Sequence, residues 1–182
     1  MQKKLILDQN LLNITISRLC QQLIENHHNF SDTVIIGLQP RGIYLAERIK
    51  QNLENIVNKK IPLGYLDTTF YRDDFRRKDE PIKANATEIP FLIEDKKVIL
   101  IDDVLFTGRS VRSALDALIA FGRPKKVELL VLVNRKYTRD LPIEPNYIGN
   151  TENKLQSQRI MVELKEQGKN KDSIWLINNI IA

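Results

Sequence analysis

"VILIDDVLFTGRSVRSAL" (residues 98–115) runs four apolar residues into the adjacent carboxylates Asp102 and Asp103, then into a Thr-Gly-Arg-Ser turn and a helical pattern. A short apolar, β-branched run of this kind predicts a strand buried in a parallel sheet. Ligands of such sheets bind beyond the carboxyl ends of the strands. The two acids are therefore expected at the ligand-binding edge of the sheet.

The turn that follows, TGRS (107–110), has the features of a phosphate-binding loop. Main-chain N–H groups at a turn and at a helix start have no partner within the helix, and they attract anions. Thr107 and Ser110 add hydroxyl donors, and Gly108 allows the main chain to approach a phosphate closely. Acids beside such a loop suit a sugar phosphate, because carboxylates accept hydrogen bonds from ribose hydroxyls.

Other interpretations of this stretch fit less well. A Walker A loop needs a lysine after its glycine and a dinucleotide fingerprint needs G-x-G-x-x-G, and neither pattern occurs here. Neighbouring residues in a strand point to opposite faces, so Asp102 and Asp103 are not expected to ligate one metal ion directly. A solvated strand end would explain a lone acidic pair, but it does not explain the complete order of strand, acids, turn and helix.

Strand and helix patterns alternate on both sides of this stretch. Buried strands are predicted at TVIIGL (33–38), KKVILI (96–101) and KVELLVLVN (126–134), with a helix over 110–121 between the last two. This alternation predicts an α/β domain with a mainly parallel sheet. Residues 135–182 contain shorter β-like pieces and are expected to form an accessory subdomain of a single domain that spans 1–182.

The amino-terminal part predicts a first helix. Apolar residues recur at helical spacing around Cys20, which is therefore expected to be buried packing rather than a reactive thiol. The pattern fades at His27 and His28, which are expected to form a polar helix end. Asp8 and Asn10 interrupt the first apolar residues where a signal peptide would continue, so a cytoplasmic protein is expected.

Composition narrows the partners only broadly. The chain has 182 residues, 42% hydrophobic content and a net charge of +5. The longest apolar run falls far short of the roughly 18 residues of a membrane-spanning helix, so no membrane association is expected. The positive charge favours anionic partners, and phosphorylated metabolites, RNA and a basic surface without a specific partner all remain open.

The 98–115 stretch closely resembles the signature of type I phosphoribosyltransferases, which bind 5-phosphoribosyl-1-pyrophosphate (PRPP). The resemblance implies the fold of that class, with a flexible hairpin loop at about 72–90 and a small hood from the tail at about 135–182. It also implies that Asp102 and Asp103 hold the ribose hydroxyls. The 5′-phosphate would be held by Phe106, Thr107, Gly108, Arg109 and Ser110. Val104 and Leu105 would either give the base an apolar face or pack in the core.

The segments LILDQNLL, GLQPRGIYLAERI, GYLDTTFYRDDF, ALIAFGRPKKVELLVLVNR and RDLPIEPNYIGN look, in this order, like the bacterial pyrimidine-operon attenuator family PyrR. The resemblance implies a uracil phosphoribosyltransferase that converts uracil and PRPP to UMP and pyrophosphate, with Mg²⁺ held through PRPP. It further implies regulation by UMP or UTP through pyrimidine leader RNA, and a dimer or tetramer. A regulator with vestigial catalysis and a purine phosphoribosyltransferase are the alternatives.

Two further segments match the family's pyrophosphate-handling loops. In QPRG (39–42), Pro40, Arg41 and Gly42 would contact pyrophosphate, and the Gln39-Pro40 bond is expected to be cis; a plain turn at a helix start is the alternative. IPLGYLDTTFY (61–71) predicts a strand that leads into the loop 72–90, either a lid or a hairpin arm. Arg72 is the first expected catalytic cation of this loop, ahead of Arg76, Arg77 and Lys78.

The resemblance also assigns residues to the base and to RNA. Arg135 and the main chain at Ile160 would lie near the uracil. Ser17, Arg18 and Arg139 fit the family's RNA face. Three positions depart from that face: Gln21 replaces the usual histidine, Glu144 the usual arginine, and Asn150 stands where Gly-Lys is usual. The loss of cations weakens the expectation of RNA binding.

Overall fold

The computed structural model describes residues 2–73, 84–153 and 158–178. Its centre is a five-stranded sheet in which every neighbouring pair is parallel, in the order β3-β2-β4-β5-β6. The strands are β2 (Thr33–Leu38), β3 (Leu63–Leu66), β4 (Lys97–Leu105), β5 (Lys126–Arg135) and β6 (Tyr147–Glu152). The predicted mainly parallel α/β sheet is therefore confirmed.

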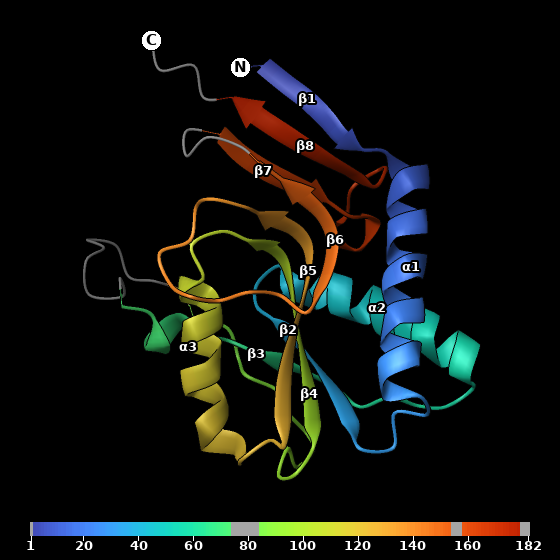
Figure 1. Ribbon diagram of the computed structural model, residues 1–182, viewed down its shortest axis with the longest axis vertical. Helices are drawn as coiled ribbons and strands as arrows, with labels where there is room; N and C mark the ends of the chain where they lie inside the picture. Colours follow the sequence, from blue (N-terminus) through green and yellow to red (C-terminus); the bar gives the residue numbers. More distant parts are fainter. Residues whose placement is uncertain (1, 74–83, 154–157, 179–182) are drawn as a thin grey trace.

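Three helices cover the two faces of this sheet: α1 (Gln9–His27), α2 (Gly42–Val57) and α3 (Arg109–Leu118). The helices α1 and α2 bury their apolar residues in one core cluster, and α3 buries its own in a second cluster across the sheet (Figure 1). Short 3-10 turns stand at η1 (Thr69–Tyr71), η3 (Ile119–Phe121) and η4 (Lys165–Gln167). None of the helices described here has the length and apolarity needed to cross a membrane.

A second sheet stands above the carboxyl ends of the parallel strands and forms the hood (Figure 1). It is antiparallel, in the order β1-β8-β7, with β1 (Gln2–Leu7), β8 (Ser173–Asn178) and β7 (Gln158–Glu163). The hood therefore does not come from the tail alone, because the first strand of the chain pairs with β8. Conversely, β6 of the tail joins the main sheet, where its main chain pairs with β5.

The predicted strand at 61–71 is shorter in the structure, because β3 ends at Leu66 and η1 follows it. Asp67 ends the extended segment: its Oδ1 accepts a hydrogen bond from the Thr69 N–H at 2.7 Å, a local side-chain turn that competes with strand pairing. Most of the loop predicted at 72–90, including Arg76, Arg77 and Lys78, lies outside the described residues.

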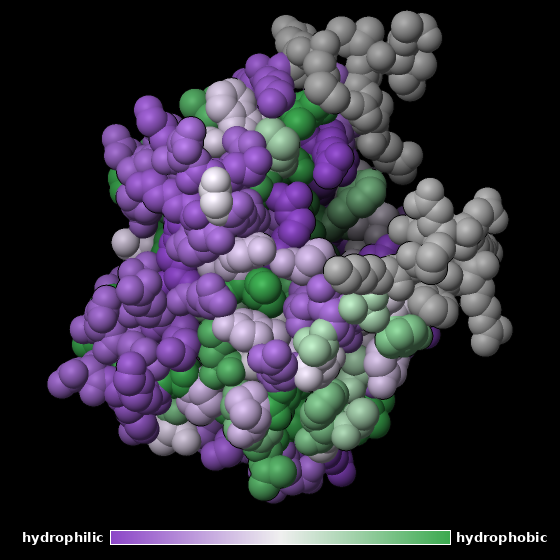
Figure 2. All heavy atoms as spheres, turned by 180° about the vertical axis from the view of Figure 1, so that it is seen from behind, coloured by the Kyte–Doolittle hydropathy of each residue, from purple (hydrophilic) through white to green (hydrophobic). Residues whose placement is uncertain are grey.

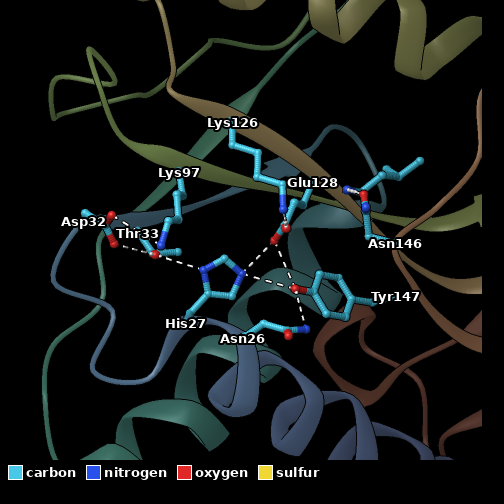
Figure 3. A network of polar contacts seen from close by, with 10 residues as sticks. Asn26, His27, Asp32, Thr33, Lys97, Lys126, Glu128, Asn146 and Tyr147 are labelled. Carbon is cyan, nitrogen blue, oxygen red and sulfur yellow. Dashed lines mark hydrogen bonds and ion pairs between the residues drawn. The ribbon is translucent and has the colours of Figure 1, made fainter.

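The end of α1 is held by a buried polar network (Figure 3). Nε2 of His27 lies 2.7 Å from Oε2 of Glu128, and its Nδ1 lies 3.0 Å from Oγ1 of Thr33. The Tyr147 hydroxyl donates to the same Glu128 oxygen at 3.0 Å. The predicted polar helix end is confirmed, because α1 ends at His27 and His28 is exposed, but His27 itself is buried. Burial lowers the pKa of His27 although the charge of Glu128 acts to raise it.

Other parts of α1 follow the pattern expected from the sequence. The side chain of Asp8 caps its amino end by accepting a hydrogen bond from the Leu11 N–H at 2.9 Å. Cys20 is fully buried, and burial raises the pKa of its thiol to about 12. A thiol with so high a pKa is a poor nucleophile, which supports the packing role predicted for it.

The outer surface differs between the two sides of the sheet. Seen from behind, hydrophilic side chains dominate the side of α1 and α2, and apolar ones gather toward the side of α3 (Figure 2). Leu92 and Ile119 are the most exposed large apolar residues on the α3 side, at 79% and 76%, with Leu115 and Phe121 also exposed. Exposed apolar groups that cluster in this way are typical of a surface that another protein covers.

Candidate active site

The features predicted from residues 98–115 meet in one cavity at the carboxyl ends of the parallel strands. The cavity has a volume of about 260 Å³. It is lined by Arg72, Asp102 and residues 104–111. The strand β4 runs to Leu105 rather than ending before the acids, because β5 continues alongside it and pairs as far as Asn134. The acids therefore lie on a paired strand and not in a loop.

The turn after β4 has the geometry expected of a phosphate loop. Gly108 has a φ of +90°, a left-handed conformation that favours glycine, and it immediately precedes α3. The Thr107 carbonyl accepts the Asp140 N–H at 3.0 Å, which ties the turn to the loop after β5. Arg109 forms ion pairs with Asp73 and Asp140 at the surface. Its side chain is therefore engaged outside the cavity, and its main chain is the part that belongs to the loop.

Arg72 approaches the same turn from the start of the long loop. Its Nη1 lies 3.5 Å from Oγ of Ser110, so a cation and a hydroxyl donor lie together at the start of α3. The flanks of the loop are held by Asp67, whose Oδ2 accepts the Asn85 N–H at 2.9 Å. Hydrogen bonds from the Thr69 and Asn85 regions outweigh the effect of burial and keep the pKa of Asp67 below its ordinary value. Asp67 was not predicted as part of the site, although an Asp two residues before a Thr is a turn signal.

The two acids have different surroundings. Oδ2 of Asp103 accepts a hydrogen bond from Nε of Arg41 at 2.7 Å, and this carboxylate is buried. Oδ1 of Asp102 accepts the main-chain N–H of Asp103 at 2.9 Å. Burial, and next the negative charge of Asp103, raise the pKa of Asp102 well above its ordinary value. One acid is thus paired with a cation while its neighbour is held where ionisation is unfavourable.

The QPRG segment lies directly beside these acids. The Gln39-Pro40 bond is cis, which confirms the prediction made for it. Gly42 begins α2, and a Cβ placed on it would lie 2.4 Å from the Ile101 carbonyl oxygen and 3.0 Å from Cα of Asp102. The glycine therefore allows α2 to start in contact with β4, which brings Arg41 within reach of Asp103.

Arg41 also reaches the hood, where its Nη2 donates to the Val162 carbonyl at 2.7 Å. Strand β7 is an edge strand of the hood sheet, so alternate residues direct their main-chain groups away from β8. Ile160, two residues before Val162, directs its N–H and C=O to this same edge, whereas its side chain is buried. The main chain at Ile160 thus shares the edge of β7 whose Val162 carbonyl Arg41 binds, and its role near uracil stays a prediction.

The wall of the cavity includes Phe106, whose ring lies beneath the guanidinium of Arg135 at 4.0 Å from the ring centroid. Arg135 is buried, at 5% exposed, at the end of β5. Leu105 and the half-buried Val104 both line the cavity, and each also packs in the core, Leu105 within one cluster and Val104 against the other. Neither residue is therefore confined to one of the two roles expected for it.

The residues predicted for RNA contact are partly used inside the protein. Arg139 donates to the carbonyls of Ile143, at 2.9 Å, and Arg135, at 3.2 Å, and so braces the end of the main sheet. Arg18 donates to the carbonyl of Ile148 in β6 at 3.2 Å, and Ser17 beside it on α1 is exposed. Arg139 also donates to the carbonyls of Leu105 and Phe106, two residues that line the cavity.

Direct metal ligation was not expected from the sequence. Within residues 2–73, 84–153 and 158–178, no three His, Cys, Asp or Glu side chains group closely enough to hold a metal ion. Mg²⁺ is usually held by one or two carboxylates together with substrate phosphates. The oxygen donors of Asp102 and Asp103 beside a phosphate loop are of the type that this arrangement needs.

Fold and site together define a phosphoribosyltransferase. The family model for the phosphoribosyl transferase domain matches residues 3–167. A hypoxanthine phosphoribosyltransferase of Trypanosoma cruzi superposes with a TM-score of 0.73 over 96% of both chains at 10% identity. A hypoxanthine-guanine phosphoribosyltransferase of Bacillus anthracis gives 0.69, covering 96% of this chain and 98% of the other at 16% identity. These solved structures show the type I fold, and at such identities they do not transfer a purine substrate.

Sequence relatives specify the family. The bifunctional protein PyrR of Brevibacillus brevis is 43% identical over 164 residues, covering 90% of this chain and 91% of the relative. PyrR of Bacillus subtilis is 41% identical over 172 residues, covering 93% and 94%. The chain belongs to the PyrR family, which unites uracil phosphoribosyltransferase activity with regulation of the pyrimidine operon. The prediction from the sequence is confirmed at this level.

Proposed function

We propose that this chain transfers the phosphoribosyl group of PRPP to uracil, with release of UMP and pyrophosphate. The observation that carries the proposal is the single cavity that unites Asp102, the phosphate loop and Arg72. The main-chain N–H groups of residues 106–110 hold the 5′-phosphate, and Asp102 and Asp103 accept hydrogen bonds from the ribose hydroxyls. Both contacts fix the sugar while its bond to pyrophosphate breaks.

Positive charge develops on the ribose ring as the pyrophosphate departs. Carboxylates near the ring stabilise this charge, and cations near the leaving group stabilise the negative charge on pyrophosphate. Arg41, which pairs with Asp103, and Arg72, which lies beside Ser110, are the cations that bind the leaving group, with Pro40 and Gly42 shaping the loop. Mg²⁺ bound to PRPP would supply further charge neutralisation on the pyrophosphate oxygens. The ion would be held through PRPP and not by Asp102 and Asp103 together, because neighbours in β4 point to opposite faces.

Recognition of uracil requires donors and acceptors at the edge of the base. The main-chain N–H and C=O groups of Ile160 on the edge of β7 offer both, and uracil presents both on its ring edge. The stacked pair of Arg135 and Phe106 forms the adjoining wall, and Val104 adds an apolar contact to the ring. A main-chain edge distinguishes pyrimidines through hydrogen bonding, which discriminates more strongly than apolar contact alone.

Replacing Arg72 with alanine tests the catalytic part of the proposal. The variant is expected to lower kcat by about a hundredfold, because a cation that stabilises the departing pyrophosphate is lost, whereas affinity for UMP changes little. Steady-state rates of pyrophosphate release and calorimetric UMP binding measure the two effects. Arg112→Ala is the matched control, because Arg112 pairs only with Asp116 on the exposed face of α3 in the described contacts. Equal losses of turnover and UMP affinity would argue against the transition-state role.

Regulation through leader RNA is the second function that we propose, and Arg18 is its principal cation on α1. The hydrogen bond from Arg18 to β6 orients the side chain while leaving its charge at an exposed position. Gln21, Glu144 and Asn150 reduce the number of phosphate contacts relative to the family pattern, so a shallow salt dependence is expected.

Two substitutions separate an RNA contact from a structural brace. Arg18→Gln is expected to weaken binding to the pyrimidine leader RNA and to reduce the slope of log K against log salt by about 1. Arg139→Gln is expected to leave that slope unchanged and to lower uracil turnover, because Arg139 braces the strand ends beside the cavity. Fluorescence titrations at several salt concentrations measure the slope. A change of slope in Arg139→Gln alone would transfer the RNA role to Arg139.

Self-association is also proposed, as a dimer or a tetramer. The exposed apolar residues on the α3 side, including Leu92 and Ile119, support a surface that is covered in solution. Light scattering over a range of protein concentrations measures the mass of the assembly. A monomer at all concentrations would contradict this part of the proposal.

A further inference from the structure

A largely buried arginine of α2, Arg48, attaches the hood to the main body of the protein. Arg48 lies two turns into α2, and it forms a bidentate pair with Asp172, in which Nη1–Oδ2 and Nη2–Oδ1 measure 2.8 and 2.9 Å. Its Nε donates to Oε1 of Glu166 at 2.6 Å. Both acids belong to the connection between β7 and β8. One guanidinium therefore holds both ends of this connection.

The surroundings of this cluster make it stronger than an ordinary surface ion pair. The Arg48 side chain is 12% exposed and that of Asp172 is 5% exposed. Burial acts to raise the pKa of Asp172, but hydrogen bonds from Arg48 and from the Lys165 N–H outweigh it and keep that pKa below its ordinary value. Bidentate pairs of this type fix direction as well as distance. The cluster of Arg48, Asp172 and Glu166 thus fixes the orientation of the hood in addition to stabilising its contact with α2.

The same helix contacts the hood at a second point. Arg41 immediately precedes α2 and binds the Val162 carbonyl, and Arg48 follows seven positions later. A separation of seven residues is about two helical turns, so the two arginines lie on the same side of α2. A cavity of about 310 Å³ separates the two contacts and is lined by Tyr44 together with residues of both parts. Arg41 is expected to turn toward pyrophosphate when PRPP binds, and Arg48 is then the attachment that remains.

We propose that Arg48 is a positioning residue that holds the edge of β7 at the correct height above the pyrophosphate loop for base recognition. The inference rests on the proposed role of the Ile160 main chain in binding uracil. Arg48 touches neither the cavity of the phosphate loop nor the acids of β4 within the described contacts. Its loss should therefore displace the hood, and with it the base contact, while the PRPP contacts on the main sheet stay in place.

Kinetics of Arg48→Met and Arg48→Lys test this division. Misplacement of about 1 Å can cost up to about a hundredfold, so Arg48→Met is expected to raise KM for uracil at least tenfold while KM for PRPP changes less than twofold. Arg48→Lys, which keeps the charge but loses the bidentate geometry, should fall between Arg48→Met and the wild type. Arg112→Met is the matched control, because it removes an arginine from the exposed face of α3. A parallel rise of both KM values, or no change in either, would overturn the proposal.

Two further measurements keep the test decisive if Arg48→Met folds poorly. Glu166→Gln removes only the more exposed partner and is expected to raise KM for uracil severalfold at unchanged melting temperature. Hydrogen exchange at residues 158–163 should be faster in Glu166→Gln than in the wild type, and exchange in β4 should be the same in both proteins. Hydrogen exchange needs no turnover, so it tests the positioning role of Arg48 even if the wild type has no activity with uracil, a result that would refute the proposed function alone. Unchanged exchange in β7 would refute the positioning role of Arg48.

Discussion

Gly42→Ala is expected to lower kcat/KM for PRPP by about a hundredfold or more, because a small displacement of reacting groups has effects of that size. The added Cβ would overlap the Ile101 carbonyl oxygen at 2.4 Å and approach Cα of Asp102 at 3.0 Å. Both atoms belong to the backbone of a central strand that cannot yield locally. The start of α2 must therefore move, and Arg41 moves with it, away from Asp103.

Steady-state kinetics with PRPP and uracil varied in turn measure this effect, and kcat/KM for PRPP should fall more than kcat/KM for uracil. Overpacking also costs stability, by about 1–3 kcal/mol, so the melting temperature must be recorded beside the rates. Gly168→Ala is a suitable control, because a Cβ there meets no atom within 4 Å although φ is +77°. It should lose some stability through strain and keep its affinity for PRPP. Full activity in Gly42→Ala would show that α2 and β4 are not required to touch.

The arrangement of residues 98–115 could be predicted because it is local. An apolar strand, two acids and a turn with glycine follow one another within a single βα unit, and their order along the chain is also their order in space. The cis bond at Gln39-Pro40 was likewise accessible, since the family resemblance implies a cis bond in this loop and proline lowers its cost. The end of β4 was not accessible, because β4 is extended by pairing with β5 and not by its own composition.

The missed features depend on residues far apart in the sequence. His27 is buried with a hydrogen-bond partner, Glu128, that lies 101 positions later in the sequence. No helical pattern near His27 indicates that partner. Arg48 and Asp172 are separated by 124 positions, and in the sequence each resembles an ordinary surface charge. The strand β1 joins the hood only because β8 at the other end of the chain offers a pairing edge. Local patterns therefore predicted the candidate site residues, whereas the contacts that hold their elements together required the fold.

Asp102→Asn is expected to abolish most turnover and at the same time to stabilise the protein. Loss of a carboxylate beside the ribose should lower kcat/KM by about a hundred- to a thousandfold, the range seen when one preorganised electrostatic group is removed. The stability gain follows from the raised pKa, because the fold disfavours the ionised form of Asp102 through burial and the charge of Asp103. A neutral amide of the same shape avoids that cost, as often occurs at functional sites.

The stability that Asp102→Asn gains over the wild type is expected to depend on pH. Because the pKa of Asp102 is higher in the folded protein than its ordinary 3.8, the acid favours folding only while it is protonated, and this contribution is lost as the pH rises through the raised pKa. Asp102→Asn should therefore match the wild type in stability below about pH 4 and gain on it as the pH rises to 8. A gain of about 1 kcal/mol corresponds to roughly 2–4 °C in melting temperature for a chain of this size.

Thermal unfolding between pH 4 and 8, with Asp116→Asn as the control, measures this difference. Asp116 is an exposed acid of α3, so its replacement should change stability little and show no such trend with pH. A variant that is inactive but no more stable at pH 8 than at pH 4 would show that Asp102 ionises without penalty in the folded protein. A variant that gains stability over the wild type toward pH 8 would show that the ionised Asp102 destabilises the unliganded protein. Ribose hydroxyls and the cations of the bound substrate are expected to relieve this destabilisation when they surround the carboxylate.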